Sequence, residues 1–198
     1  MQSRSLILGA VLALAVLVPI GGVASTYNTL VRLDQSVTAQ WAQVENACQR
    51  RADLVPNLVA VVKAAASHER ETLEAVTAAR AHIGGLAPDA LRDPQALQRY
   101  QAAQEQLSSA ISRLVAVAEA YPQLRANENF LALQAQLEGT ENRISVERQR
   151  FNDEARAFNT RRDTFPTVLF VGAFGDRFAA KAYFTATAEA KQAPRVEI

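Results

Sequence analysis

Histidine and carboxylate side chains that could hold a metal ion occur together at one point of this chain. His68 and Glu69 are adjacent, as at the start of the metalloprotease pattern His-Glu-x-x-His. That pattern needs a second histidine four residues later, so that both rings face one metal ion, but position 72 is Thr. His82 lies about 21 Å further along if the segment is helical. The spacing argues against a zinc site, and an unrecognised hydrolase or metal site around His68 and Glu69 stays an alternative.

Other catalytic and cofactor-binding patterns are also missing from the sequence. Di-iron bundles need a glutamate three residues before each histidine, and neither histidine has one. The pair Gly84-Gly85 lacks the further glycines and the lysine of a phosphate-binding loop. Cys48 is the only cysteine, which excludes a disulfide framework. The sequence therefore predicts a protein that is not an enzyme and that holds no cofactor or metal.

A polar cluster beside a proline is the first candidate for an interaction site. Arg50, Arg51 and Asp53 precede Pro56 and Asn57. Proline removes a backbone donor and clashes with the preceding helical turn, so we expect a helix to break or kink here. Arg51 and Asp53 either pair locally or bind the backbone groups that Pro56 frees. The second interpretation is favoured, because buried backbone groups need partners.

Apolar residues recur every seven positions over much of the chain, a pattern typical of long helices that pack at small crossing angles. The first such helix is expected to end near Leu54 and the second to span about 57–83. Asp93 is a candidate cap for a third helix that Pro94 opens and that ends before Pro122. The predicted fold class is all-α, an up-and-down bundle of about four long helices.

The fourth of these helices has the most regular pattern. It starts near Asn127 or two residues later, and Phe165-Pro166 ends it. Asn152 and Asn159 each follow a phenylalanine of the repeat, and we expect them to make hydrogen bonds between helices rather than to bind a ligand. The repeat itself comprises Phe130, Leu137, Ile144, Phe151, Phe158 and Phe165.

An uncharged stretch precedes the bundle. No charged residue lies between Arg4 and Arg32, and residues 6–24 are almost wholly apolar. A helix needs about 20 apolar residues to cross a bilayer, so this stretch predicts a transmembrane anchor in contact with membrane lipid. A cleaved signal peptide is the alternative, but the length of the apolar run and the interfacial Tyr27 favour a retained anchor.

Three segments follow from these patterns. Residues 1–25 are the expected anchor and residues 26–166 the bundle, while residues 167–198 form a tail. The tail has a short apolar run and an aromatic cluster, and we expect it to be partly helical, to fold back on the bundle and to fray at residues 193–198.

The charge distribution leaves the membrane orientation open. Arg4 and the α-amino group favour an N-terminus inside the cell, whereas Arg32, Arg50 and Arg51 favour the reverse. The formal net charge of +1 gives no electrostatic footprint for nucleic acid.

Several short motifs occur in order along nearly the whole chain. They are residues 27–31 (YNTLV), Trp41, residues 50–59 (RRADLVPNLV), His68-Glu69, residues 126–130 (ANENF), residues 141–144 (ENRI), Phe151-Asn152, Phe158-Asn159 and Phe165-Pro166. Together they resemble the LemA family of bacterial membrane proteins, although that family commonly has Tyr where Phe151 and Phe158 stand. The resemblance implies an N-terminal membrane helix, an α-helical bundle and no assigned enzymatic activity. It also implies a short N-terminus outside the cell.

The expected function is that of a membrane-tethered interaction or scaffold protein at the bacterial inner membrane. The segment 50–59 and the aromatic tail are the surfaces expected to meet a protein partner. A structural homo-oligomer is an alternative, because a seven-residue repeat does not distinguish packing within one chain from packing between chains.

Overall fold

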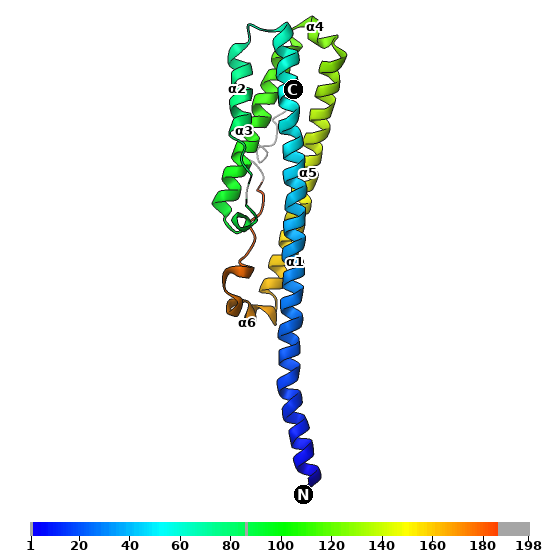
Figure 1. Cartoon of the computed structure of the whole chain (residues 1–198), viewed down its shortest axis with the longest axis vertical. Helices are drawn as coiled ribbons and strands as arrows, with labels where there is room; N and C mark the ends of the chain where they lie inside the picture. Colours follow the sequence, from blue (N-terminus) through cyan, green and yellow to red (C-terminus); the bar gives the residue numbers. More distant parts are fainter. Residues whose placement is uncertain (1, 86, 186–198) are drawn as a thin grey trace, which may run out of the picture.

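The chain is an elongated bundle of α-helices (Figure 1). The computed structural model describes residues 2–85 and 87–185, without the side chains of residues 2–8, 10–14, 16, 18–19 and 89. Within those ranges every regular element is helical and no strand occurs, which confirms the predicted all-α class. The elements are α1 (Gln2–Ala65), α2 (Arg70–Ala81), η1 (Pro88–Arg92), α3 (Pro94–Glu119), α4 (Pro122–Arg125), α5 (Glu128–Asp163), α6 (Thr167–Val171) and η2 (Gly172–Phe178).

Helix α1 is 64 residues long and passes Pro56 without interruption. The expected break at Pro56 is therefore wrong, and so is a separate helix over 57–83, because the chain turns only at residues 66–69. Pro56 lacks the N–H that would bind the carbonyl oxygen of Ala52. That oxygen accepts a hydrogen bond from Nε of Arg80 instead, at 2.9 Å. Since α2 supplies the missing donor, the helix can continue.

The ends of α3 and α5 follow local sequence signals. The Asp93 side chain accepts a hydrogen bond from the backbone N–H of Gln95 at 2.8 Å, which confirms the predicted cap of α3. The Asn127 side chain accepts hydrogen bonds from the N–H groups of Asn129 and Phe130, at 2.9 and 3.2 Å, and so caps α5.

The seven-residue repeat of α5 forms the inner face of the bundle. Its buried members are Phe130, Leu137, Ile144, Phe151 and Phe158. The expectation that Phe165 continues this buried face is wrong, because α5 ends at Asp163 and the Phe165 side chain is 72% exposed. Helix α5 runs antiparallel to α1 and packs along it, whereas α2 packs against α3.

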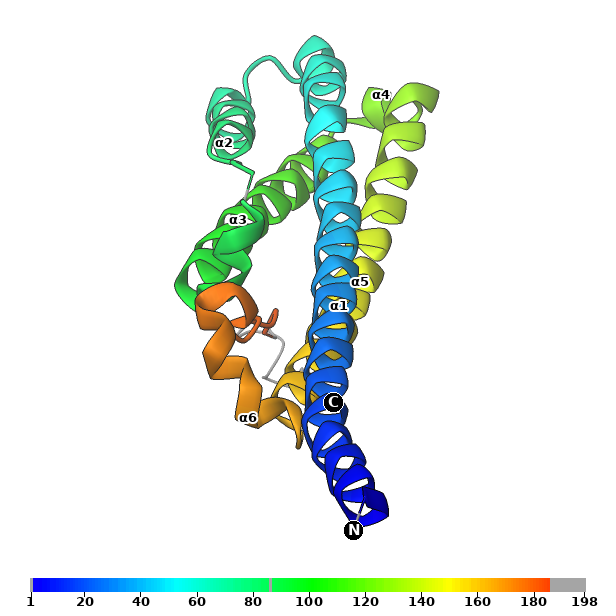
Figure 2. The same ribbon diagram turned by 60° about the horizontal axis from the view of Figure 1, so that its bottom comes forward.

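The tail folds back on the bundle, as the sequence predicts. Helix α6 and η2 lie beside the lower part of α1, below the end of α3 (Figure 2). Residues 179–185 then run on without helical structure toward α3. The predicted fraying of residues 193–198 lies outside the described residues.

The expected anchor at residues 6–24 belongs to α1. Among the residues that the structure describes, none of the helices combines the length and the apolar character needed to span a membrane. Most side chains of residues 6–19 lie outside the described part of the chain.

Candidate functional site

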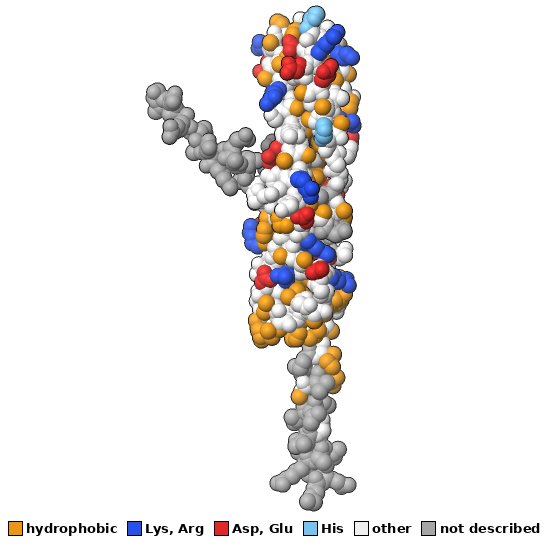
Figure 3. Space-filling model, turned by 90° about the vertical axis from the view of Figure 1, so that its left-hand side faces the viewer, with side chains coloured by type: hydrophobic (Ala, Val, Ile, Leu, Met, Phe, Trp, Pro, Cys, Tyr) orange, Lys and Arg blue, Asp and Glu red, His pale blue; other side chains and the backbone are white. Residues whose placement is uncertain are grey.

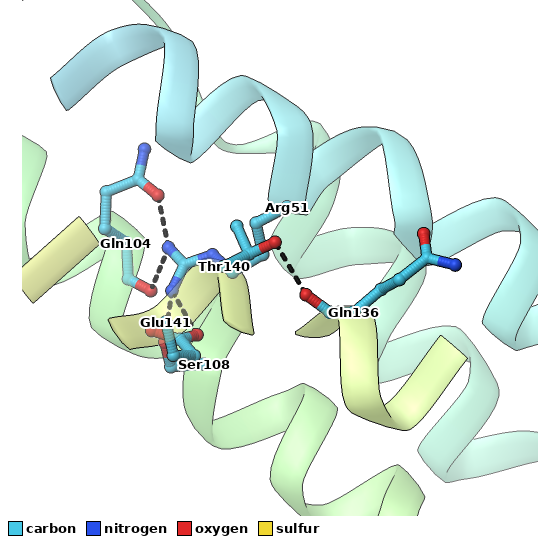
Figure 4. A network of polar contacts seen from close by, with 6 residues as sticks. All are labelled: Arg51, Gln104, Ser108, Gln136, Thr140 and Glu141. Carbon is cyan, nitrogen blue, oxygen red and sulfur yellow. Dashed lines mark hydrogen bonds and ion pairs between the residues drawn. The ribbon is translucent and has the colours of Figure 1, made fainter. Parts of the chain in front are cut away.

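A buried arginine connects three helices at the middle of the bundle (Figure 4). Arg51 on α1 is 2% exposed. Its Nη1 donates to the Ser108 hydroxyl of α3 and to Oε1 of Glu141 on α5, the latter at 2.6 Å. Its Nη2 donates to the carbonyl oxygen of Gln104, at 3.2 Å, and to the side-chain oxygen of the same residue. We call Arg51, Gln104, Ser108 and Glu141 the polar layer.

The polar layer divides the hydrophobic core into two clusters. Below it the core reaches Cys48 on α1, Tyr100 on α3 and Ile144 on α5. Above it the core resumes with Val55, Leu107 and Leu137 of the same three helices. Arg51 thus occupies a core position of the repeat. A buried polar group at such a position is best known for fixing the register between helices.

The sequence interpretation of the charge cluster is corrected by these contacts. Arg51 does not pair with Asp53, whose exposed carboxylate accepts a hydrogen bond from Gln49 at 2.8 Å. Neither residue binds the carbonyl group that Pro56 frees, which Arg80 satisfies. The signal for the observed role is that residue 51 lies three residues after the core residue Cys48 and four before Val55.

A small cavity of about 40 Å³ lies against the polar layer, lined by Cys48, Arg51, Tyr100, Gln104 and Arg148 together with Val44, Glu105, Ser108, Glu141 and Ile144. Three buried donors of the lining have no hydrogen-bond partner, namely Nε of Arg51, Nε2 of Gln104 and one terminal nitrogen of Arg148. A cavity of this size is large enough for a water molecule, which could satisfy such donors.

Two of the titratable groups that line this cavity, the Cys48 thiol and the Tyr100 hydroxyl, are kept in their protonated, neutral form. Burial raises the pKa of the Cys48 thiol above its ordinary value of 9.0. Burial also raises the pKa of the Tyr100 hydroxyl, and its hydrogen bond with Cys48 acts in the same direction. A nucleophilic cysteine needs a lowered pKa and a general base needs one near neutrality. The Cys48 thiol is therefore not activated as a nucleophile, and the Tyr100 hydroxyl is not poised as a general base.

Two asparagines of α5 bind the backbone of the tail. Asn159 donates to the carbonyl oxygen of Lys181 at 2.9 Å and accepts from its N–H at 2.8 Å. Asn152 makes the same pair of bonds with Phe184, at 3.0 and 2.9 Å. Asn152 and Asn159 are seven residues apart on a helix, and Lys181 and Phe184 are three residues apart in an extended chain, and both spacings are about 10 Å. The two pairs of hydrogen bonds therefore fit an extended backbone, and we call residues 181–184 the bracketed segment. The prediction that the two asparagines bind another helix is therefore wrong, because they bind the extended backbone of the tail.

The bracketed segment carries its side chains into the bundle. Lys181 is 4% exposed and forms an ion pair of 2.5 Å with Asp34 on α1. The Phe184 ring stacks on Trp41 with 5.9 Å between ring centroids, and the Arg148 guanidinium lies 4.4 Å from the Phe184 centroid. The sequence analysis missed Lys181, whose one local peculiarity is that it is a single lysine within an apolar, aromatic segment.

The aromatic tail is consequently not a free partner surface. Phe178 and Phe184 are buried, and Phe174 packs against Tyr27 at 5.3 Å between ring centroids. This corrects the expectation that the tail aromatics meet a protein partner. Of that cluster, Tyr183 keeps an exposed side chain.

Both histidines lie on the surface, His68 in the turn between α1 and α2 and His82 directly after α2. His68 is exposed, and the Glu69 carboxylate accepts a hydrogen bond from the Tyr121 hydroxyl at 2.8 Å. That bond raises the pKa of Tyr121. Nδ1 of the exposed His82 forms a hydrogen bond with the carbonyl oxygen of Ala78, at 2.7 Å. Among the described residues no three His, Cys, Asp or Glu side chains form a group that could hold a metal ion.

The other residues predicted for the site do not converge on one place. Those on the outer face of α1 are exposed: Arg50, Asp53, Pro56 and Asn57. Asn127 acts as a helix cap, and Phe165-Pro166 lies in the turn between α5 and α6. Only the pair Asn152 and Asn159 binds a common element.

A family model described as the LemA family matches residues 40–198, which include all of the polar layer and the bracketed segment. No curated protein matches the chain.

Proposed function

The chain belongs to the LemA family, and on that premise we propose that it is a non-enzymatic scaffold of the bacterial inner membrane. In this proposal residues 6–24 anchor the chain in the bilayer, and the bundle presents a protein partner with a rigid surface. The partner surface is the end of the bundle farthest from the N-terminus.

The continuity of α1 is the observation that carries this proposal. One helix runs from Gln2 through the uncharged stretch and into both core clusters, with no linker between them. At 1.5 Å per residue it is about 96 Å long. A bundle built on such a helix is held at a fixed distance and angle from whatever holds residues 6–24, which suits a scaffold.

An open groove between α1 and α2 supports the placement of the partner surface. It has a volume of about 750 Å³, and its lining combines Val59, Leu73 and Ala78 with Lys63 and Arg70. Apolar groups with a few polar ones at the edge are typical of protein-binding surfaces.

Photo-crosslinking in intact membranes tests the partner. A photoreactive amino acid at the exposed Lys63 of the groove is compared with one at the exposed Gln149 on α5. We expect a defined protein adduct from position 63 and none from position 149. Identical background from both positions would sink the proposal of a partner at this groove.

Membrane fractionation with cysteine labelling tests the anchor and its orientation. Cys48 is buried and unsuitable, so the exposed Asn57 is replaced by cysteine in a Cys48→Ala chain. We expect the chain to stay in the membrane during alkaline carbonate extraction. Release into the supernatant would contradict the anchor. Labelling by an impermeant maleimide from one side then assigns the compartment of the bundle.

The two alternatives have less support. The apolar faces of α1, α3 and α5 are buried within one chain, so packing inside the chain accounts for the repeat and a homo-oligomer is not needed to explain it. A strict monomer at all concentrations in sedimentation would exclude it. For a metal site around His68 and Glu69, the carboxylate is already bound by Tyr121.

A further inference from the structure

Three large apolar side chains are exposed together where α5 turns into α6. They are Phe165, Val168 and Leu169, exposed by 72%, 47% and 65%, and we call them the collar. Figure 3 shows hydrophobic side chains gathered at this lower end of the body, around the place where the N-terminal part of α1 emerges. Single exposed apolar residues are ordinary, but three within five positions at one end of a bundle are a patch that needs an explanation.

The helix register places the collar level with the end of the apolar residues 6–24 of α1. Ser36 of α1 donates to Glu154 of the antiparallel α5 at 2.7 Å, and Gln40 donates to Glu147 at 2.8 Å. Because both helices rise equally per residue, the end of α5 at the collar lies level with about residue 25 of α1.

The burial of α1 gives the same level independently. Thr26 is 3% exposed and is the first buried side chain of α1 among those that the structure describes. One residue further, the Tyr27 ring packs against Phe174 and Phe178 of the tail, at 5.3 and 5.6 Å between ring centroids. The bundle therefore starts to cover α1 where residues 6–24 end.

The chemistry at this level fits the boundary between lipid headgroups and acyl chains. The guanidinium of Arg177, in the tail segment that follows the collar, lies 5.2 Å from the centroid of the Tyr27 ring. Tyrosine and arginine next to exposed apolar side chains are typical of that boundary. Asp163 and Asp176 are exposed in the same segment, so attraction to anionic lipid does not explain the patch. Three side chains are also far too few for a stable protein interface.

We propose that the collar dips into the surface of the bilayer that residues 6–24 cross, so that the bundle stands directly on the membrane with no stalk. This inference rests on the proposed anchor. It adds a second membrane contact, made by residues distant in sequence from the anchor, whose partner is the apolar part of the lipid surface.

Fluorescence quenching by lipid tests the collar in the full chain. Leu169→Cys, Leu17→Cys and Leu131→Cys are each made in a Cys48→Ala chain and labelled with an environment-sensitive fluorophore. Leu169 lies in the collar and Leu17 in the expected anchor, while Leu131, 48% exposed near the start of α5, is the matched control. The chains are reconstituted in phosphatidylcholine vesicles with and without brominated acyl chains.

We expect brominated lipid to cause a large loss of emission at positions 17 and 169 and none at position 131. Quenching at 17 without quenching at 169 would overturn the collar and leave the anchor standing. No quenching at 17 would overturn the anchor and with it the collar. Quenching at all three positions would show that the bundle lies on the membrane rather than standing on it, against the inference.

A second label position guards against a local effect of the substitution. Phe165→Cys is treated in the same way and is expected to behave as Leu169→Cys does. The emission of the buried Trp41 checks that each labelled chain is folded. A folded Phe165→Cys chain that is not quenched, with position 17 quenched, would also overturn the collar.

Discussion

The carbonyl oxygen of Ala52, which Pro56 leaves without a helical partner, is bound by Nε of Arg80 at 2.9 Å. Ala52 is 5% exposed, so this oxygen has little access to water. Arg80→Met keeps the length of the side chain but removes the donor. We expect it to lower the free energy of unfolding by about 1 kcal/mol, as measured by urea denaturation.

A second substitution separates this bond from general effects of Arg80. Pro56→Ala restores a backbone N–H that can bind Ala52 within the helix, and should itself stabilise the chain. In the Pro56→Ala chain the loss caused by Arg80→Met should shrink toward zero. An undiminished loss would show that Arg80 acts through other contacts.

The polar layer gives the second prediction. Arg51→Ala should lower the free energy of unfolding by about 2–4 kcal/mol, because it leaves Gln104, Ser108 and Glu141 without their common partner. The lower part of that range is included because Glu141 is 43% exposed and its charge is partly solvated. Arg51→Lys should recover part of the loss, since lysine keeps the charge but lacks the planar fork.

The neighbouring arginine provides the matched control for this measurement. Arg50 is exposed, and Arg50→Ala should change the free energy of unfolding by less than about 0.5 kcal/mol. Equal losses of unfolding free energy in Arg50→Ala and Arg51→Ala would contradict the conclusion that Arg51 holds the three helices together.

The sequence predicts the parts of this fold that rest on periodicity and local caps. The repeat from Phe130 to Phe158 marks a buried face, and Asp93 and Asn127 cap helices as their positions indicate. Pro56 misleads because its cost is offset by Arg80, a residue 24 positions away in sequence. No local rule contains that contact.

The candidate site is predicted less well, for a related reason. Arg51 and Asn152 are recognisable as unusual residues, but their partners lie on other elements and depend on how the tail folds back. For Lys181 the burial itself is not predictable from the sequence. An isolated lysine is expected at the surface, and only the nearby Asp34 on α1 makes its burial possible.

The third prediction concerns the docking of the tail. Asn152→Ala removes both hydrogen bonds to the Phe184 backbone, so we expect faster amide exchange at residues 181–185 with little change along α5. Hydrogen–deuterium exchange measures this directly. The exposed Asn142 on the same helix gives the control, and Asn142→Ala should leave the exchange of the tail unchanged. Tail protection that persists in Asn152→Ala would show that side-chain packing alone holds the segment.

The pair Cys48 and Tyr100 predicts how stability responds to alkaline pH. Burial raises the pKa of the Cys48 thiol above its ordinary value of 9.0, and the pKa of Tyr100 is raised as well. Well below pH 9 both groups are protonated in the folded and the unfolded chain, so their contribution to stability is fully present there. As pH rises above 9, the unfolded chain releases the thiol proton while the folded chain retains it. The free energy of unfolding should then fall with increasing pH.

The variant that isolates this effect is Cys48→Ala, compared with the parent chain by urea denaturation at pH 7, 9 and 10. Alanine lacks the packing of the thiol, so the variant is expected to be less stable at pH 7. The decisive quantity is the slope of the free energy of unfolding against pH. Between pH 9 and 10 the loss of stability should be smaller in Cys48→Ala than in the parent chain, because one proton fewer is released on unfolding. Parallel slopes would mean that the Cys48 thiol titrates in the folded bundle as it does in the unfolded chain, which its burial beside Tyr100 argues against.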